Sequence, residues 1–119
     1  MNCVVVAAKR GGQVRMAACL VRASARADVN GVVRRRMGAR KASFARQDEV
    51  VEATGMEYGG ITPIGLPGDW PILVDSAVLE CPHAVIGSGV RRSKLIVPGA
   101  ALADLPGAEV IEGLGVPVE

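Results

Sequence analysis

Residues 58–68, with the sequence YGGITPIGLPG, constrain the fold of this chain more than any other stretch. Four glycines and two prolines fall within these eleven positions. Glycine allows positive φ and the close approach of another backbone, whereas proline fixes φ and has no N–H donor. The mixture predicts a rigid, shaped loop that presents its peptide N–H and C=O groups. Glycine and proline pairs also connect strands, so a purely structural connection is an equally good interpretation of this stretch alone.

A second glycine-containing segment, Gly87-Ser88-Gly89, follows a strand-like run and is a candidate to face the first loop across a cleft. Neither segment has the pattern of a nucleotide-phosphate loop. No G-x-G-x-x-G opens a helix, and no G-x-x-x-x-G-K-[ST] occurs. Dinucleotide and P-loop sites are therefore weaker interpretations than a site built from backbone groups.

Composition limits the core and the chemistry. The chain has 119 residues, which is one domain with a real core, and half of them are apolar although only Phe44, Tyr58 and Trp70 are aromatic. A core of Val, Ala, Leu and Ile suits a sheet packed by short helices. The three cysteines form no C-x-x-C and His83 is the only histidine, so we expect no metal, no cofactor and no His-based catalysis. The apolar run at residues 3–8 is too short for a signal or a membrane span, which favours a cytoplasmic protein.

Basic residues are unevenly distributed although the formal net charge is only +2. One group falls within residues 34–46 and a second within residues 91–94. A phosphate-rich partner and a solvated helix face with a charged loop explain this clustering equally well. The candidate nucleic-acid contacts are Arg34, Arg35, Lys41, Arg91, Arg92 and Lys94.

Hydrophobic patterns predict about six short strands and three helices in one α/β (α+β) domain that spans residues 1–119. Asp28 is a plausible N-cap for the first helix, and Gly55 follows the second. The mixture of hairpins and crossovers indicates a mixed sheet that curls toward a barrel. Strands are expected at residues 3–8, 14–21, 71–75, 84–86, 94–97 and 108–111, a strand or extended link at 41–45, helices at 28–37, 46–54 and 98–105, a turn of helix at 77–80 and a tail at 113–119.

The order of these features resembles the YbaK/ProX family of aminoacyl-tRNA deacylases from about Asn2 to about Glu112. The most specific part is a G-x-x-x-P motif on Gly59 to Pro63, which follows Thr54-Gly55. The resemblance implies a mixed, barrel-like α/β fold. It also implies hydrolysis of the ester that holds a wrong amino acid, such as Cys or Ala, on proline tRNA. The implied partners are the acceptor end of a mischarged tRNA and prolyl-tRNA synthetase.

The resemblance also assigns residues to a pocket made by the two glycine segments. Backbone N–H groups there would form an oxyanion hole, worth about 3–4 kcal/mol per well-placed donor, so no side-chain nucleophile is required. We expect Gly60→Ala to cut any deacylase activity at least tenfold with little loss of stability, because it would crowd the pocket. The implied catalytic positions are Gly59, Gly60, Thr62 and Pro63, and the implied substrate-binding positions are Asn2, Gly65, Asp75, Gly87, Ser88 and Gly89.

One departure from the family concerns charge. The family has a characteristic lysine at the start of the first strand, where this chain has Asn2, and Lys9 lies about 20 Å away at ~3.3 Å per residue. Asparagine donates a hydrogen bond but supplies no positive charge. The family's N-terminal segment is also missing, so a homodimer that covers the exposed first strand is a further expectation. The alternative function is a catalytically impaired member that binds an aminoacyl-tRNA end or a related small ligand.

Overall fold

The computed structural model describes residues 1–118. The fold is built on a long β-hairpin at the N-terminus. Strands β1 (Asn2–Arg10) and β2 (Gln13–Val21) pair antiparallel along their whole length. The two connecting residues, Gly11 and Gly12, have φ of 56° and 82°, as a two-residue hairpin turn requires. The predicted hairpin is confirmed.

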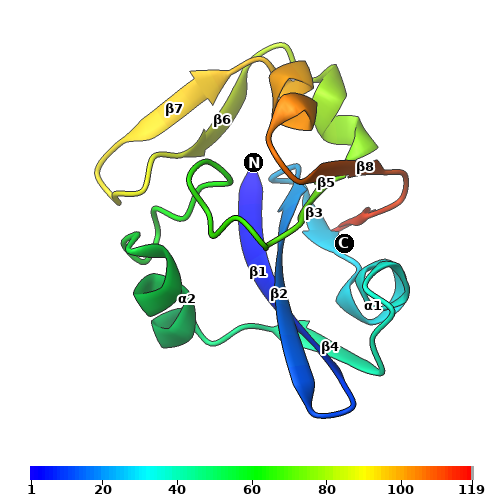
Figure 1. The fold of residues 1–119 in the computed structure, drawn as a ribbon. Helices are drawn as coiled ribbons and strands as arrows, with labels where there is room; N and C mark the ends of the chain where they lie inside the picture. Colours follow the sequence, from blue (N-terminus) through cyan, green and yellow to red (C-terminus); the bar gives the residue numbers. More distant parts are fainter. Residues whose placement is uncertain (119) are drawn as a thin grey trace.

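Three further strands extend this hairpin into a five-stranded mixed sheet with the order β4-β1-β2-β5-β8. Strand β4 (Lys41–Phe44) pairs antiparallel with β1, whereas β5 (Ile72–Asp75) lies parallel to β2 and β8 (Ala108–Ile111) lies parallel to β5. Figure 1 shows β1 and β2 at the centre of the molecule. The mixed α/β fold is confirmed, but within residues 1–118 the sheet keeps two open edges, at β4 and β8, and does not close into a barrel.

Two small sheets raise the number of strands in the described chain to nine, where about six were expected. Strand β6 (Ala84–Gly87) pairs antiparallel with β7 (Lys94–Val97), as the sequence predicts. Strand β3 (Ala25–Ala27) pairs with β9 (Gly115–Pro117), which corrects the tail that was expected at residues 113–119 as far as residue 118, since residue 119 lies outside the described residues. These three-residue strands are too short for an alternating pattern, and Leu114 anchors the segment in the core.

Short helices cover the sheet. The predicted helix at residues 28–37 is a wide helical turn, η1 (Val29–Val33), that continues into α1 (Arg34–Arg36), and Asp28 caps it by accepting from the Gly31 and Val32 N–H groups. Helix α2 (Gln47–Thr54) ends at Gly55 as expected. The short helices η2 (Ser76–Glu80) and η3 (Gly99–Asp104) confirm the other two expectations. No helix in the described part of the chain is long and apolar enough to cross a membrane.

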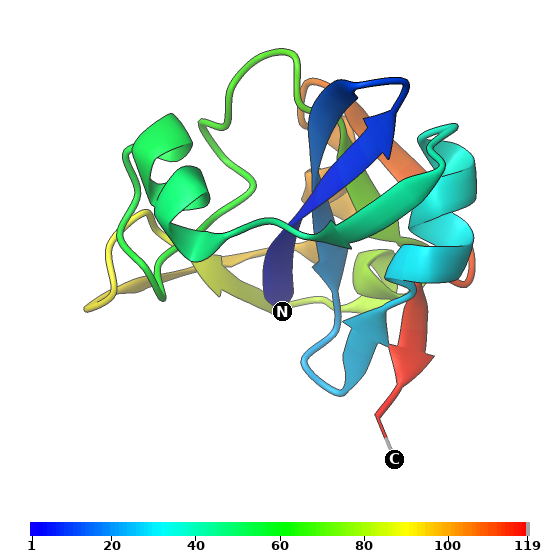
Figure 2. The same ribbon diagram turned by 90° about the horizontal axis from the view of Figure 1, so that it is seen from below.

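The core lies on both faces of the sheet because successive side chains of a strand point to opposite sides. Cys19 belongs to a cluster covered by η1, and its neighbour Leu20 belongs to a cluster covered by η2, η3 and β6. Helix α2 packs separately, with Val50 against Val5 and Trp70. Figures 1 and 2 show α1 and α2 on opposite sides of the β1–β2 hairpin. The start of β1 lies against β6, where the Met1 terminal ammonium donates to Val85 O over 2.9 Å.

Candidate functional site

The two glycine segments touch each other through their backbones. Gly89 N–H donates to Gly60 O over 2.7 Å, and Glu57 N–H donates to Gly89 O over 2.9 Å. The Glu57 carboxylate adds a third link by accepting from Arg91 N–H over 3.0 Å. The segments were expected to face each other across a cleft, and the structure instead joins residues 57–61 directly to residues 87–91. We call this pair of joined segments the loop clasp.

The clasp requires glycine at two positions because main-chain atoms occupy the place of a side chain. A Cβ on Gly60 would lie 2.6 Å from the carbonyl carbon of Val90, and a Cβ on Gly87 would overlap the carbonyl oxygen of Ile61. Gly60 N–H also donates to Glu57 O over 2.9 Å, so this donor is engaged within the turn. The expectation that Gly60→Ala leaves stability nearly unchanged is therefore wrong.

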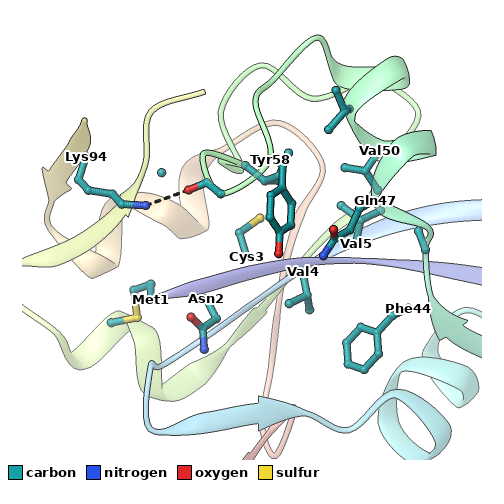
Figure 3. A pocket seen from close by; sticks show the side chains of 15 residues that line it. Met1, Asn2, Cys3, Val4, Val5, Phe44, Gln47, Val50, Tyr58 and Lys94 are labelled. Atoms are coloured by element: carbon teal, nitrogen blue, oxygen red, sulfur yellow. Dashed lines mark hydrogen bonds between the residues drawn. The ribbon is translucent and has the colours of Figure 1, made fainter. Parts of the chain in front are cut away.

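A cavity of about 370 Å³ opens beside the clasp, between the start of β1 and helix α2 (Figure 3). Its volume is in the range of small-ligand sites. Of the residues assigned to the site from the sequence, the structure brings together Asn2, Gly59, Gly87 and Lys94. The rest of the lining consists of Met1, Cys3, Val4, Val5, Phe44, Ala45, Gln47, Val50, Val51, Tyr58 and Ile61.

Lys94 is the cationic side chain of the cavity, and the terminal ammonium of the lining residue Met1 is a second cation, which donates to Val85 O over 2.9 Å. Lys94 lies opposite Gly87 in the β6–β7 pair and is the only Lys or Arg among the lining residues. Its Nζ donates to Gly59 O over 3.2 Å, shown by the dashed line in Figure 3. An ammonium has three N–H donors, so two remain for a ligand. The sequence grouped Lys94 with residues for nucleic-acid backbone, whereas the structure places it in the cavity wall.

Cys3 is the only thiol in the cavity, and it is not ionised near neutral pH. Burial raises the pKa of the Cys3 thiol to about 12, and burial together with the nearby Cys3 raises the pKa of Cys19 to about 12 as well. A thiol is a nucleophile only as thiolate. Among the described residues, no carboxylate or imidazole lines the cavity either. Its chemistry therefore depends on hydrogen-bond donors, the ammonium groups of Lys94 and Met1, and solvent.

Thr62, Pro63 and Gly65 shape the loop and do not line the cavity. Thr62 and Pro63 are buried, and Thr62 Oγ1 accepts from Ile64 N–H over 3.4 Å. Gly65 has φ of 83° in the same loop. These contacts hold the shape of the stretch that follows Gly59.

Asp75, Ser88 and Gly89 also lie outside the cavity lining. Asp75 is buried at the end of β5, and its carboxylate lies against Gly115 in the C-terminal strand β9. Ser88 Oγ lies 2.7 Å from Ser93 Oγ and 3.0 Å from Ser93 O, so its hydroxyl closes the β6–β7 loop. Gly89 belongs to the clasp.

The basic candidates fall in three separate places. Arg34 and Arg35 lie in α1, on the other side of the β1–β2 hairpin from α2 (Figure 2), and Arg34 Nε donates to Asn30 O over 2.8 Å. Lys41 lies opposite Lys9 in a basic groove at the hairpin end. Arg91 and Arg92 lie in the β6–β7 loop, next to Lys94 in the chain. Only this last group adjoins the cavity.

Sequence reasoning missed Phe44, Gln47 and Tyr58 as cavity residues. Phe44 ends β4, Gln47 begins α2, and Tyr58 follows α2 directly before Gly59. The rarity of aromatic residues was a usable signal. The chain has only three of them, and Phe44 and Tyr58 are the two whose side chains are exposed. Gln47 gave no signal, because polar residues are common at the start of a helix.

We predict that Gly60→Ala lowers the free energy of unfolding by about 1–3 kcal/mol, because overpacking against Val90 must displace one loop of the clasp. Urea denaturation measures the change. Gly68→Ala is the matched control, since no atom lies within 4 Å of the added Cβ. That variant should stay within about 0.5 kcal/mol of the parent chain. Equal unfolding midpoints for the two variants would contradict the packing role of Gly60.

Comparisons with known proteins agree with this architecture. The chain matches the model of the aminoacyl-tRNA editing domain over residues 1–105, and no curated protein matches it. The crystal structure of hypothetical protein APE2540 has a TM-score of 0.83 at 24% identity, covering 97% of this chain and 73% of that chain. The crystal structure of a candidate trans-editing enzyme for prolyl-tRNA synthetase has a TM-score of 0.78 at 26% identity, covering 93% of this chain and 67% of that chain. The chain belongs to the aminoacyl-tRNA editing domain family.

Proposed function

We propose that this chain is a trans-editing deacylase that hydrolyses the ester between a wrongly attached amino acid and the 3′ end of a tRNA. The expected substrates resemble Cys or Ala on proline tRNA, and prolyl-tRNA synthetase is the expected partner. The observation that carries the proposal is the cavity beside the loop clasp. In a chain of the editing-domain family, it combines peptide groups with the Lys94 ammonium, and among the described residues no carboxylate, imidazole or ionised thiol lines it.

Hydrolysis of an aminoacyl ester suits such a cavity because the ester is already activated. A water molecule attacks the carbonyl carbon, and negative charge develops on the carbonyl oxygen. The bond to the ribose oxygen then breaks, and that oxygen takes up the proton released by water. The site has to hold the carbonyl and stabilise the oxyanion, and a well-placed donor contributes about 3–4 kcal/mol to this step.

We assign the positive charge in this step to Lys94. Its ammonium already contacts Gly59 O at the cavity wall and keeps two free donors for a substrate oxygen. The amide of Asn2 and the Gly59 peptide group supply neutral hydrogen-bonding groups at the same cavity. Lys94 thus provides the charge that Asn2 lacks. Thr62 and Pro63 support the loop, and we propose that Asp75, Gly65, Ser88 and Gly89 act on the substrate only through loop shape.

A second function is favoured by one observation, the neutral side chain at Asn2. A cavity with a neutral amide there and a lysine already bonded to Gly59 O suits recognition of an aminoacyl-tRNA end without hydrolysis. The two functions differ in turnover, so one assay separates them.

The deciding measurement is deacylation of a panel of correctly and incorrectly charged tRNAs by the purified chain and by Lys94→Met. We expect release of one mischarged amino acid, and at least a tenfold lower kcat/KM for Lys94→Met because the oxyanion loses its cation. Lys9→Met, a lysine at the far end of β1, is the matched control and should match the parent chain. The double variant Lys94→Met with Asn2→Lys tests whether a charge at the other position restores the rate.

The outcomes of this panel separate the two functions. Binding of the tRNA end without release of any amino acid would support the binding module. Turnover by the single variant Asn2→Lys, run in the same panel, without turnover by the parent chain would mean that the native chain lacks a sufficient charge. Full activity of Lys94→Met would assign the reaction to backbone and amide donors instead of Lys94.

We predict that a Cys3 thiolate takes no part in the reaction. Because burial raises the pKa of Cys3 to about 12, the thiol stays protonated from pH 6 to pH 9. Iodoacetamide at pH 8 should leave Cys3 unmodified in the folded chain and alkylate it fully in urea, as read by mass spectrometry. Rapid alkylation of folded Cys3 with parallel loss of activity would contradict this prediction.

We also propose that Arg91 and Arg92 meet the phosphates of the acceptor end. The Arg91 side chain lies against Gly59 of the cavity lining, which supports this, whereas Arg34 and Arg35 lie on the other side of the hairpin. The pair Arg91→Gln and Arg92→Gln should weaken tRNA binding and reduce the slope of log affinity against log salt by about one to two. Arg34→Gln with Arg35→Gln removes the same charge and is the control. A larger effect in the control pair would move the tRNA to the α1 face.

A further inference from the structure

Phe44 and Tyr58 are unusual among the side chains that line the cavity. Both rings are more than half exposed, at 60% and 56%, while the third aromatic residue, Trp70, is 8% exposed in the core. The chain has three aromatic residues in all, and two of them border one cavity from different elements. Large aromatic surface left in water at a concave site is typical of a place where a planar ligand binds.

Both rings are carried on backbone that is held in place. Phe44 ends β4, where it pairs with Val6, and the pairing continues through the hydrogen bond from Ala45 N–H to Val5 O. Tyr58 lies inside the turn closed by Gly60 N–H on Glu57 O, which is part of the loop clasp. A rigid mounting lowers the entropic cost of binding, because the rings need little ordering when a ligand arrives.

The cavity has two chemically different ends. In Figure 3, Lys94 lies at one end and Phe44 at the other, with Tyr58 and Gln47 between them. The Lys94 end holds the cation and the Gly59 peptide group. From the middle of the cavity to the other end lie the two rings and the Gln47 amide, which offers both a donor and an acceptor.

This division matches the chemistry of a tRNA end. The amino acid is esterified to the ribose of the terminal adenosine, so a cavity that holds the ester must accommodate an adenine base nearby. Bases stack on aromatic side chains, which raises affinity roughly five- to a hundredfold per base. A glutamine amide pairs with the N6 and N7 atoms of adenine through a donor and an acceptor.

We infer that Phe44 and Tyr58 form a stacking site for the terminal adenine of tRNA, and that the Gln47 amide contacts the edge of that base. The inference rests on the proposed function, because it takes the tRNA end as the ligand. It adds a base-binding subsite to the ester-binding end of the cavity, and it explains why a chain with so few aromatic residues exposes two of them together.

The test uses the trinucleotide CCA and the same molecule with an abasic ribose in place of the terminal adenosine, titrated into the full chain by calorimetry. We expect CCA to bind at least tenfold more tightly than the abasic probe. Tyr58→Leu and Phe44→Leu should each reduce CCA affinity at least fivefold and leave abasic binding unchanged. Tyr58→Phe and Phe44→Tyr keep a ring and should retain CCA affinity.

A matched control separates stacking from a general loss of apolar surface. Ile96 is 68% exposed and lies outside the cavity, so Ile96→Ala should bind CCA like the parent chain. Equal affinity for CCA and the abasic probe would overturn the inference. An equal loss of affinity for both probes in the leucine variants would also overturn it. So would a lower sedimentation mass of the free Tyr58→Leu chain than of the parent chain, because that would show that a second copy covers the rings.

The binding experiment tests the stacking site, and the deacylation assay tests the proposed function, so either proposal can fail without the other. Adenine-dependent binding without deacylation of any charged tRNA would support the stacking site and overturn the proposed hydrolysis. Deacylation with equal binding of the two probes would support the hydrolysis and overturn the stacking site.

Discussion

The site depends on two stretches of backbone that approach each other with no side chain between them. Gly60 against Val90 and Gly87 against Ile61 leave no room for a Cβ, and the hydrogen bonds of the clasp form only at this separation. Through this contact the loop after α2 and the β6–β7 hairpin become one rigid wall. Gly59, Tyr58 and Lys94 keep their relative positions because that wall holds all three.

The cavity wall concentrates charge in one place. Lys94 supplies the one side-chain ammonium in a described lining of peptide groups, amides, rings and aliphatic side chains, and the Met1 terminal ammonium is engaged by Val85 O over 2.9 Å. Burial raises the pKa of Cys3 and so removes a competing nucleophile from the same space. A site with one cationic side chain and many neutral donors is suited to a ligand that carries its own reactive bond, since the protein then has to position that bond and stabilise charge on one oxygen.

Local patterns predicted much of the fold. The β1–β2 hairpin, α2 with Gly55, and the Asp28 cap follow from short-range rules of turns and helix ends. The β3–β9 pair was missed because three-residue strands about 90 positions apart leave no periodic signal.

The residues of the site were predicted only in part. Gly59 and Gly87 were found because glycine at a close approach is visible in sequence. Lys94 was assigned to another role, and Phe44, Gln47 and Tyr58 were missed, because strand pairing and loop contacts decide which side chains share a cavity.

The pairing of Gly87 with Lys94 has a consequence for the length of the turn between them. Side chains alternate along a strand, so a shift of one residue in β7 would turn Lys94 to the other face of the hairpin. If the loop kept its length between the paired positions, deletion of one turn residue would place Leu95 opposite Gly87, and insertion of one would place Ser93 there. Such a shift of register would remove the Lys94 charge from the cavity even if the residue types that line it were retained. The register set by the turn between β6 and β7 therefore decides whether the cavity has a lysine side chain in its wall.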